Sequence, residues 1–501
     1  MLILTYFVTI AYAWYESFTI FIYQTDVIFY AQFHLIVDGF AFLIEHLRLS
    51  PTFIASVILT IAVSIALLVI VIKAVLRDEV ACSLSLWSKV SLMTLLILSL
   101  YAVLFHGRIM DSPKSAISSQ IAKLQKNIGE SRRLVQEVKA MEDLDYPHLY
   151  NYDGYSLLAR PNIYLVFIES YGSILYKREA FRDSYFSKLE EKQRILQSNG
   201  WFTSSALSES TSWGGGSWMA YTSLLFGMRV DNHPQYLSLL DRFQEEAYPD
   251  FGFTLRSLGY RYIRATSLAV ELDDEEWQRY VNFFGVDDWI RYRDFDYHGM
   301  HYGWGPSPPD QYILSAAHER ISKQSEDPFF LFLITQNSHY PWRRVPELAD
   351  DWNTLNDGHA VVALFDEQST PLSVKQDNYI EAISYQLDFL VDFISNQAAD
   401  DDIFILVGDH QPGYVSRRSD GFDTPLHIIS RDRNFVEAFS AYGFEPELKL
   451  NNTRPAIKHE GFYSLFMNVF LRYYGQGKTP PPYLPDGIDL SGLSSTITVT
   501  D

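Results

Sequence analysis

Cysteine is almost absent from this chain, which has 501 residues and a single cysteine, Cys82. One thiol cannot form an intramolecular disulfide, and zinc clusters built from several cysteines are excluded as well. A metal ion bound elsewhere in the chain must therefore be held by oxygen atoms and imidazole nitrogens.

Basic residues are in deficit. The chain has 61 acidic and 40 basic residues, which gives a formal net charge of -21 at pH 7. A surface with this excess of negative charge is not suited to neutralising a phosphate backbone, so we expect no nucleic-acid partner.

Long apolar runs are confined to the first 106 residues. Residues 51–76 and 87–105 are each long and apolar enough to predict a membrane span. Residues 2–23 predict a third span, and residues 27–47, which contain charged side chains, predict a weaker fourth. No small-residue cleavage site follows the first run, which disfavours a removable signal peptide.

Basic residues between the two strongest spans predict the orientation of the chain. Lys73, Arg77 and Lys89 lie in or beside this short loop, and short loops rich in lysine and arginine face the cytoplasm. The second of these spans would then deliver the rest of the chain to the periplasmic or extracellular side of the cell membrane.

The pattern divides the chain into four predicted parts. These are a transmembrane region (1–106), a juxtamembrane helical linker (107–150), an extracytoplasmic domain (151–474) and a tail rich in proline, glycine and serine (475–501). Within the linker, apolar residues at roughly helical spacing predict an amphipathic helix over residues 111–143.

Three short apolar runs predict strands in the extracytoplasmic domain, at residues 163–168, 329–334 and 403–407. Each run is continuous rather than alternating, which is typical of strands that are covered on both faces in an α/β sheet. Residues 375–395 predict one of the covering helices.

Polar residues follow each of these runs. Glu169 follows the first run directly, His339 follows the second after a short turn, and Asp409 and His410 follow the third. In open α/β sheets, ligands bind beyond the carboxyl ends of the strands. These residues therefore predict a metal or phosphate site at one edge of the sheet.

A hydroxyl group opens a predicted helix between the first two runs. Three glycines precede Ser217, and a helical pattern continues from it until Gly227, which is a typical helix-ending residue. A serine at a helix start is ordinarily an N-cap. The glycine-rich backbone and the helix N-terminus also suit an anion, and a hydroxyl group there can act as a nucleophile.

The order of these motifs resembles the alkaline-phosphatase superfamily, and in particular its membrane-anchored sulfatase-like branch. The motifs are a strand ending in Glu169, a small-residue turn into a hydroxyl group, "NSHYP" and "VGDH". This branch includes lipoteichoic acid synthase and the phosphoethanolamine transferases, and the resemblance covers about residues 162–470. It implies an alkaline-phosphatase-like α/β sheet sandwiched by helices and preceded by a bundle of transmembrane helices.

The resemblance also implies the site residues. The implied ligands of a divalent metal, Zn²⁺ or Mn²⁺, are Glu169, Ser217, Asp409 and His410. Ser217 fits the nucleophile, and Thr211 is the runner-up. His339, Trp304 and His427 would bind substrate or a second metal; Trp304 fits either the wall of a phosphoglycerol pocket or an indole packed in a turn.

The function implied is transfer of a phosphoglycerol or phosphoethanolamine group from a membrane phospholipid to an external glycan or lipid acceptor, through a phospho-enzyme. The alternatives are a membrane-anchored phosphodiesterase or phosphatase that gives the group to water, and a catalytically inactive binding protein. A sulfatase-type hydrolase is disfavoured, because Met219 and Tyr221 occupy the positions of the proline or alanine and of the arginine in the sulfatase maturation motif.

Overall fold

The computed structural model describes the middle of the predicted linker and most of the domain that follows it. The described residues are 8, 11–17, 19, 20, 27–33, 55, 56, 59, 62, 63, 65–67, 69, 70, 87, 90, 94, 120–142, 150–268, 272–303, 305–342, 344–358, 367 and 370–488. The predicted membrane spans fall largely outside them. Among the described residues, no helix combines the length and the apolar character that a bilayer crossing requires.

The chain forms two compact units. The first comprises residues 1–21 and 26–135, and the second comprises residues 22–25 and 136–501. Within the first unit, the Asn127 side chain accepts a hydrogen bond from the Phe29 backbone N–H (2.8 Å), and Lys123 pairs with Glu16 (2.7 Å). A helix, α5 (Gln120–Glu142), lies in the range where the sequence predicts the linker helix.

The second unit is built on a mixed sheet with the strand order β10-β3-β8-β7-β2-β6-β4-β5, and β9 also pairs with β3. The strands are β2 (Ile163–Ile168), β3 (Phe202–Glu209), β4 (Arg261–Ala265), β5 (Asp288–Ile290), β6 (Phe329–Ile334), β7 (Ile403–Gly408), β8 (Asp423–Ser430), β9 (Glu445–Pro446) and β10 (Ile457–Lys458). β8 runs antiparallel to β3 and β7. A separate antiparallel pair joins β1 (Ser156–Leu157) to β11 (Gly475–Gln476).

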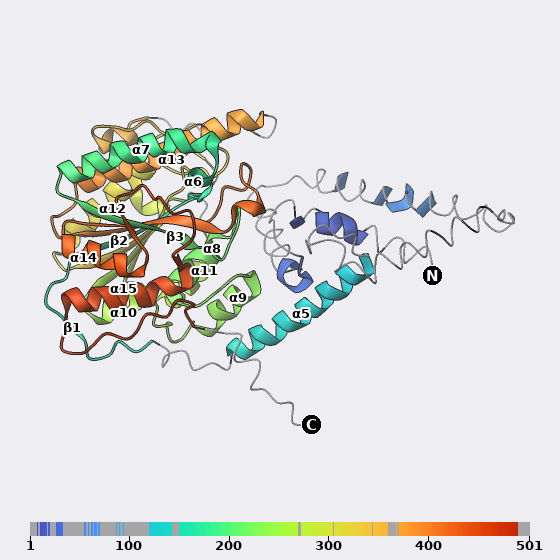
Figure 1. Cartoon of the computed structure of the whole chain (residues 1–501), viewed down its shortest axis with the longest axis horizontal. Coiled ribbons are helices and arrows are strands. Elements are labelled where there is room, and N and C mark those ends of the chain that lie inside the picture. Colours follow the sequence, from blue (N-terminus) through green and yellow to red (C-terminus); the bar gives the residue numbers. More distant parts are fainter. Residues whose placement is uncertain are drawn as a thin grey trace, which may run out of the picture. The chain divides into compact units, whose positions relative to one another are not determined.

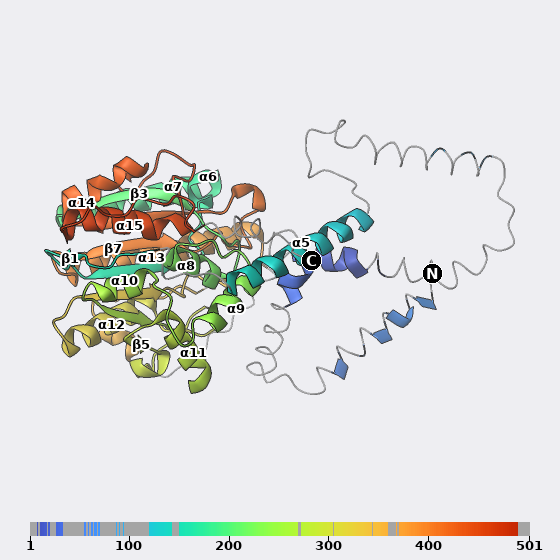
Figure 2. The ribbon, with the colours of Figure 1, turned by 90° about the horizontal axis from the view of Figure 1, so that it is seen from below.

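Helices cover both faces of the sheet (Figures 1 and 2). They are α6 (Ile174–Lys177), α7 (Glu179–Ser198), α8 (Ser217–Phe226), α9 (His233–Arg242), α10 (Phe251–Ser257), α11 (Asp274–Phe284), α12 (Asp310–Gln324), α13 (Leu372–Asn396), α14 (Arg433–Ala438) and α15 (His459–Tyr474). Short 3₁₀ helices occupy Tyr292–Phe295, Trp352–Asn356, Arg418–Asp420 and Phe439–Tyr442. The predictions of a helix over residues 218–226, directly after Ser217, and of a helix over residues 375–395 are confirmed by α8 and α13, and α8 begins one residue earlier, at Ser217.

The central strand β2 explains why the predicted strands read as continuous apolar runs. All six of its residues are buried. Ile163, Leu165 and Phe167 pack in the core shared with α8, α10 and α15, while the alternate residues pack in the core shared with α7, α12 and α13. Because successive side chains of a strand point to opposite faces, a strand between two apolar layers has no polar position.

The three predicted strands are neighbours, since β2 lies between β6 and β7 and pairs in parallel with both. Ile168 is in register with Gly408, and Phe167 is in register with Ile334. The residues that follow these strands are therefore delivered to one edge of the sheet.

Candidate active site

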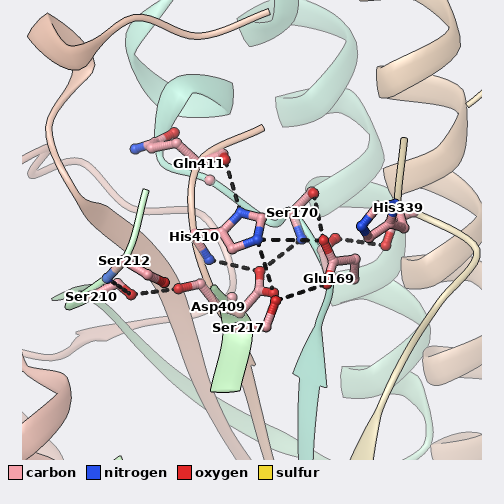
Figure 3. A network of polar contacts seen from close by, with 12 residues as sticks. Glu169, Ser170, Ser210, Ser212, Ser217, His339, Asp409, His410 and Gln411 are labelled. Carbon is pink, nitrogen blue, oxygen red and sulfur yellow. Dashed lines mark hydrogen bonds and ion pairs between the residues drawn. The ribbon is translucent and has the colours of Figure 1, made fainter. Parts of the chain in front are cut away.

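Glu169, Asp409 and His410 form a buried cluster at that edge (Figure 3). One ligand atom from each residue lies within 4.8 Å of the others. The His410 Nε2 atom is 3.5 Å from Glu169 Oε1 and 3.4 Å from Asp409 Oδ2. The cluster arises from register, because Glu169 and Asp409 immediately follow two parallel strands whose last residues are paired.

The His410 ring is oriented as metal-binding histidines usually are. Its Nδ1 atom lies 2.9 Å from the Gln411 carbonyl oxygen, which can only accept, so Nδ1–H donates and Nε2 faces the carboxylates. Burial alone would lower the pKa of His410, but the charges of Asp409 and Glu169 raise it. The carboxylates thus favour a positive charge beside Nε2.

The Asp409 carboxylate has one satisfied oxygen and one unsatisfied oxygen. Oδ1 accepts hydrogen bonds from the backbone N–H groups of Ser170 (2.8 Å) and His410 (2.7 Å). Oδ2 is buried and accepts no hydrogen bond from the described residues. Burial and the charge of Glu169 raise the pKa of Asp409 to about 7. A buried carboxylate oxygen of this kind fits a metal ligand. A bound cation would offset the cost of burying the carboxylate and its repulsion by Glu169.

Ser217 joins this cluster. Its Oγ atom donates to Glu169 Oε2 at 3.3 Å, although the two residues come from α8 and from the end of β2. The N-cap position of α8 belongs to Gly216, so Ser217 is the first residue of the helix rather than its N-cap. The hydroxyl group is therefore directed at the carboxylates and lies at the positive end of the helix.

The glycines before Ser217 are required by the backbone. Gly214, Gly215 and Gly216 have φ values of 66°, 151° and 80°, which side-chain-bearing residues rarely adopt. A Cβ atom on Gly216 would also lie 2.6 Å from the Met219 side chain. This turn directs the first residue of α8 toward the end of β2.

Thr211, the alternative nucleophile, is placed differently. It is buried, and its hydroxyl group is hydrogen-bonded to Ser223 Oγ at 3.2 Å. Of the two candidate hydroxyl groups, Ser217 is the one that contacts a carboxylate of the cluster.

His339 lies beside the cluster (Figure 3). Its Nδ1 atom is 2.6 Å from the Tyr340 carbonyl oxygen and must donate to it, so Nε2 is the acceptor nitrogen. Burial lowers the pKa of His339 to about 4, the Tyr340 hydrogen bond opposes this shift, and the charge of His410 adds to it. The ring is therefore neutral at pH 7.

His427 does not join the candidate site. Both ring nitrogens of His427 are engaged inside the sheet, Nδ1 with Ser205 Oγ (2.7 Å) and Nε2 with the Tyr171 hydroxyl (3.0 Å). Burial lowers its pKa to about 3. We leave His427 out of the proposed site, and Trp304 lies outside the described residues.

Ser170 is a contributor that the sequence did not single out. It is buried with φ at +57°, an unusual value for a residue other than glycine. In this conformation its N–H reaches Asp409 Oδ1, while its Oγ atom donates to Glu169 Oε1 at 2.9 Å. The only signal in the sequence is its position directly after Glu169. Backbone strain of this kind tends to occur at functional sites.

Replacing Ser170 should weaken metal binding. We expect both Ser170→Ala and Ser170→Gly to lower the affinity for Zn²⁺ or Mn²⁺ by ~10-fold, because both remove the hydroxyl group that orients Glu169. Titration calorimetry measures the metal affinity, and thermal melting compares the stability of the two variants. Glycine tolerates the positive φ, so the glycine variant should melt at or above the alanine variant. Wild-type affinity in both variants would leave Ser170 with no role in orienting Glu169.

His459 was also not anticipated. It is fully buried at the start of α15, where its Nδ1 atom contacts Ser208 Oγ (2.7 Å) and its Nε2 atom contacts the Gly408 carbonyl oxygen (3.2 Å). The carbonyl oxygen can only accept, so Nε2–H donates and Nδ1 accepts. His459 thus links the ends of β3 and β7 rather than joining the metal cluster.

Two carboxylates, an imidazole and a hydroxyl group at a helix N-terminus define a candidate mononuclear metal site with a nucleophile beside it. Oxygen and imidazole ligands of this kind suit Zn²⁺ or Mn²⁺. The fold and the site define an α/β domain with a candidate metal site at one edge of its sheet.

No protein-family model matches the chain, and no curated protein matches its sequence. Among solved structures, the chain is similar to the lipoteichoic acid synthase LtaP from Listeria monocytogenes, at 15% identity over 71% of this chain and 81% of that chain, with a TM-score of 0.41. It is similar to the phosphoglycerol transferase GacH from Streptococcus pyogenes, at 14% identity over 67% and 80%, with a TM-score of 0.39. It is also similar to the integral membrane protein lipooligosaccharide phosphoethanolamine transferase A (EptA) from Neisseria meningitidis, at 11% identity over 90% and 80%, with a TM-score of 0.47.

The similar structures thus include a lipoteichoic acid synthase and a phosphoethanolamine transferase, the two kinds of protein that the sequence resembles.

Proposed function

We propose that this chain is a membrane-bound, metal-dependent phosphotransferase. It would move a phosphoglycerol or phosphoethanolamine group from a phospholipid to a glycan or lipid acceptor outside the cytoplasm. The observation that carries the proposal is the convergence of Ser217 with Glu169, Asp409 and His410 at one edge of the sheet. The membrane spans predicted in the first 106 residues would keep this site near its lipid donor.

The first half-reaction follows from the position of Ser217. Glu169, Asp409, His410 and Ser217 Oγ would hold the divalent cation, whose charge lowers the pKa of a nearby hydroxyl group and offsets the charge of phosphate oxygens. Ser217 Oγ loses its proton and forms a bond to phosphorus. The bond from phosphorus to the diacylglycerol oxygen breaks, and diacylglycerol leaves as an alcohol after gaining a proton. The head-group phosphate is then esterified to Ser217.

The second half-reaction returns the enzyme to its starting state. A hydroxyl group of the acceptor attacks phosphorus, the bond to Ser217 Oγ breaks, and the serine regains a proton. His339 suits the role of hydrogen-bond acceptor for this hydroxyl group, because its ring is neutral and its Nδ1–H is already donated to the Tyr340 carbonyl oxygen. An acceptor nitrogen pairs with a hydroxyl group better than with an ionised phosphate oxygen.

The test is a transfer assay with the purified full chain, Zn²⁺ or Mn²⁺, and phospholipid labelled in its head group. Transfer predicts label on an added glycan or lipid acceptor and release of diacylglycerol. Label found only in a soluble phosphate ester would instead support the phosphodiesterase alternative. No release of diacylglycerol under any of these conditions would favour the binding-protein alternative.

A further inference from the structure

Two stacked tyrosines, Tyr340 and Tyr414, lie on the two loops that carry His339 and His410. Tyr340 directly follows His339, and Tyr414 follows His410 after a short turn. The two phenol rings are 3.8 Å apart between centroids and are tilted by 27°. The Lys375 Nζ atom lies 5.9 Å from the Tyr340 ring centroid and 5.6 Å from the Tyr414 ring centroid. The pair therefore forms one margin of the candidate site.

Apolar side chains are exposed at this margin. Tyr414 is 51% exposed, Leu372 is 52% exposed and Val374 is 40% exposed. Leu372, Val374 and Lys375 all lie in the first turn of α13, and Leu372 is three positions from Lys375, which places the two on the same side of the helix. We call Tyr414, Leu372 and Lys375 the rim patch; Val374, two positions from Leu372, lies on another side of the helix.

The rim patch has the composition of a surface that contacts the interface of a bilayer. Tyrosine is enriched at the level of lipid head groups, aliphatic side chains enter the boundary of the acyl chains, and lysine attracts anionic lipids. No step of the proposed chemistry uses Leu372, so the mechanism does not explain its exposure.

We propose that the rim patch contacts the interfacial layer of a bilayer that contains anionic lipids, on the side of the domain that carries the His339 and His410 loops. The inference rests on the proposed function, because it explains how a lipid phosphate would approach Ser217 without leaving the membrane. The contact itself does not require turnover, so it is measured separately.

Lipid-borne quenchers test this contact in the full chain reconstituted in nanodiscs. In a Cys82→Ser background, Leu372→Cys and Tyr414→Cys each receive a bimane fluorophore, and Leu158→Cys is the matched control. Leu158 is 68% exposed and directly follows β1, whose Leu157 packs with the core on the sheet face opposite to α13. Fluorescence is compared with and without nitroxide-labelled lipid in phosphatidylglycerol and phosphatidylcholine nanodiscs.

We expect nitroxide lipid to lower the fluorescence at positions 372 and 414 at least twofold more than at position 158, and more in phosphatidylglycerol than in phosphatidylcholine. Lys375→Glu should reduce the difference between the two lipids. Equal quenching at all three positions would overturn the proposal. So would a fluorescence at position 414 that does not respond to nitroxide lipid and changes only when a soluble glycan is added. Turnover without selective quenching would refute the contact alone, whereas selective quenching without turnover would refute the proposed function alone.

Discussion

Ser217→Ala should abolish group transfer. We expect the rate to fall by at least ~10³-fold, because the variant lacks the oxygen that bonds to phosphorus. Metal affinity should fall much less, because Glu169, Asp409 and His410 remain in place. After an acid quench, the mass of the intact wild-type chain should show a fraction carrying the head-group phosphate. The variant should show none, while Ser217→Thr, which keeps a hydroxyl group, should retain part of the activity.

Thr211→Val is the matched control for this nucleophile. The variant loses only the hydrogen bond to Ser223, which costs about 1 kcal/mol of stability. We expect transfer to stay within a few-fold of wild type. The opposite pattern, with transfer abolished in Thr211→Val and retained in Ser217→Ala, would show that Thr211 is the nucleophile.

Asp409→Asn should remove the metal site. The substitution keeps the shape of the side chain but removes the charge and the unsatisfied oxygen that face His410 and Glu169. We expect the affinity for Zn²⁺ or Mn²⁺ to fall by at least ~100-fold, since substitution of even an indirect partner of a metal site costs 10–100-fold. Calorimetry measures the affinity. Metal at ~100 times its dissociation constant should stabilise wild type by about 2.7 kcal/mol and should leave the melting temperature of the variant almost unchanged.

Without metal, Asp409→Asn should be at least as stable as wild type, whereas with metal the wild type should be the more stable of the two. Burial and the charge of Glu169 raise the pKa of Asp409 to about 7. The stabilisation from protonated Asp409 is fully present below its unfolded pKa and is lost as the pH rises through about 7. Asparagine cannot ionise, so at pH 8 metal-free Asp409→Asn should melt at or above metal-free wild type. This difference should shrink as the pH is lowered to 5.

Asp402 supplies the control for Asp409→Asn. It is also a fully buried aspartate whose pKa is raised, to about 6, mainly by burial, but it precedes β7 at the end away from the cluster. Asp402→Asn should leave metal affinity unchanged. Equal loss of affinity in both variants would show that the effect comes from disturbing β7 and not from removing a ligand.

Local sequence pattern determined much of the fold around the site. The apolar runs identified β2, β6 and β7, because a strand between two helix layers has no polar position. The glycines before Ser217 and the glycine after Phe226 identified the bounds of α8, because each takes a positive φ. These signals are local, and they require only a residue and its neighbours in the chain.

Only the tertiary structure decided which side chains meet. The sequence offered both His339 and His427 as residues that bind substrate or a second metal, with His339 the stronger of the two. Pairing of β8 with β3 turns His427 toward Ser205, and the Tyr340 carbonyl oxygen orients His339 beside the cluster. The backbone of Ser170, which holds Asp409 from 239 positions away, left no pattern in the sequence. Apolar periodicity reports which face of an element is buried, whereas the direction of a polar side chain depends on partners that folding brings from distant parts of the chain.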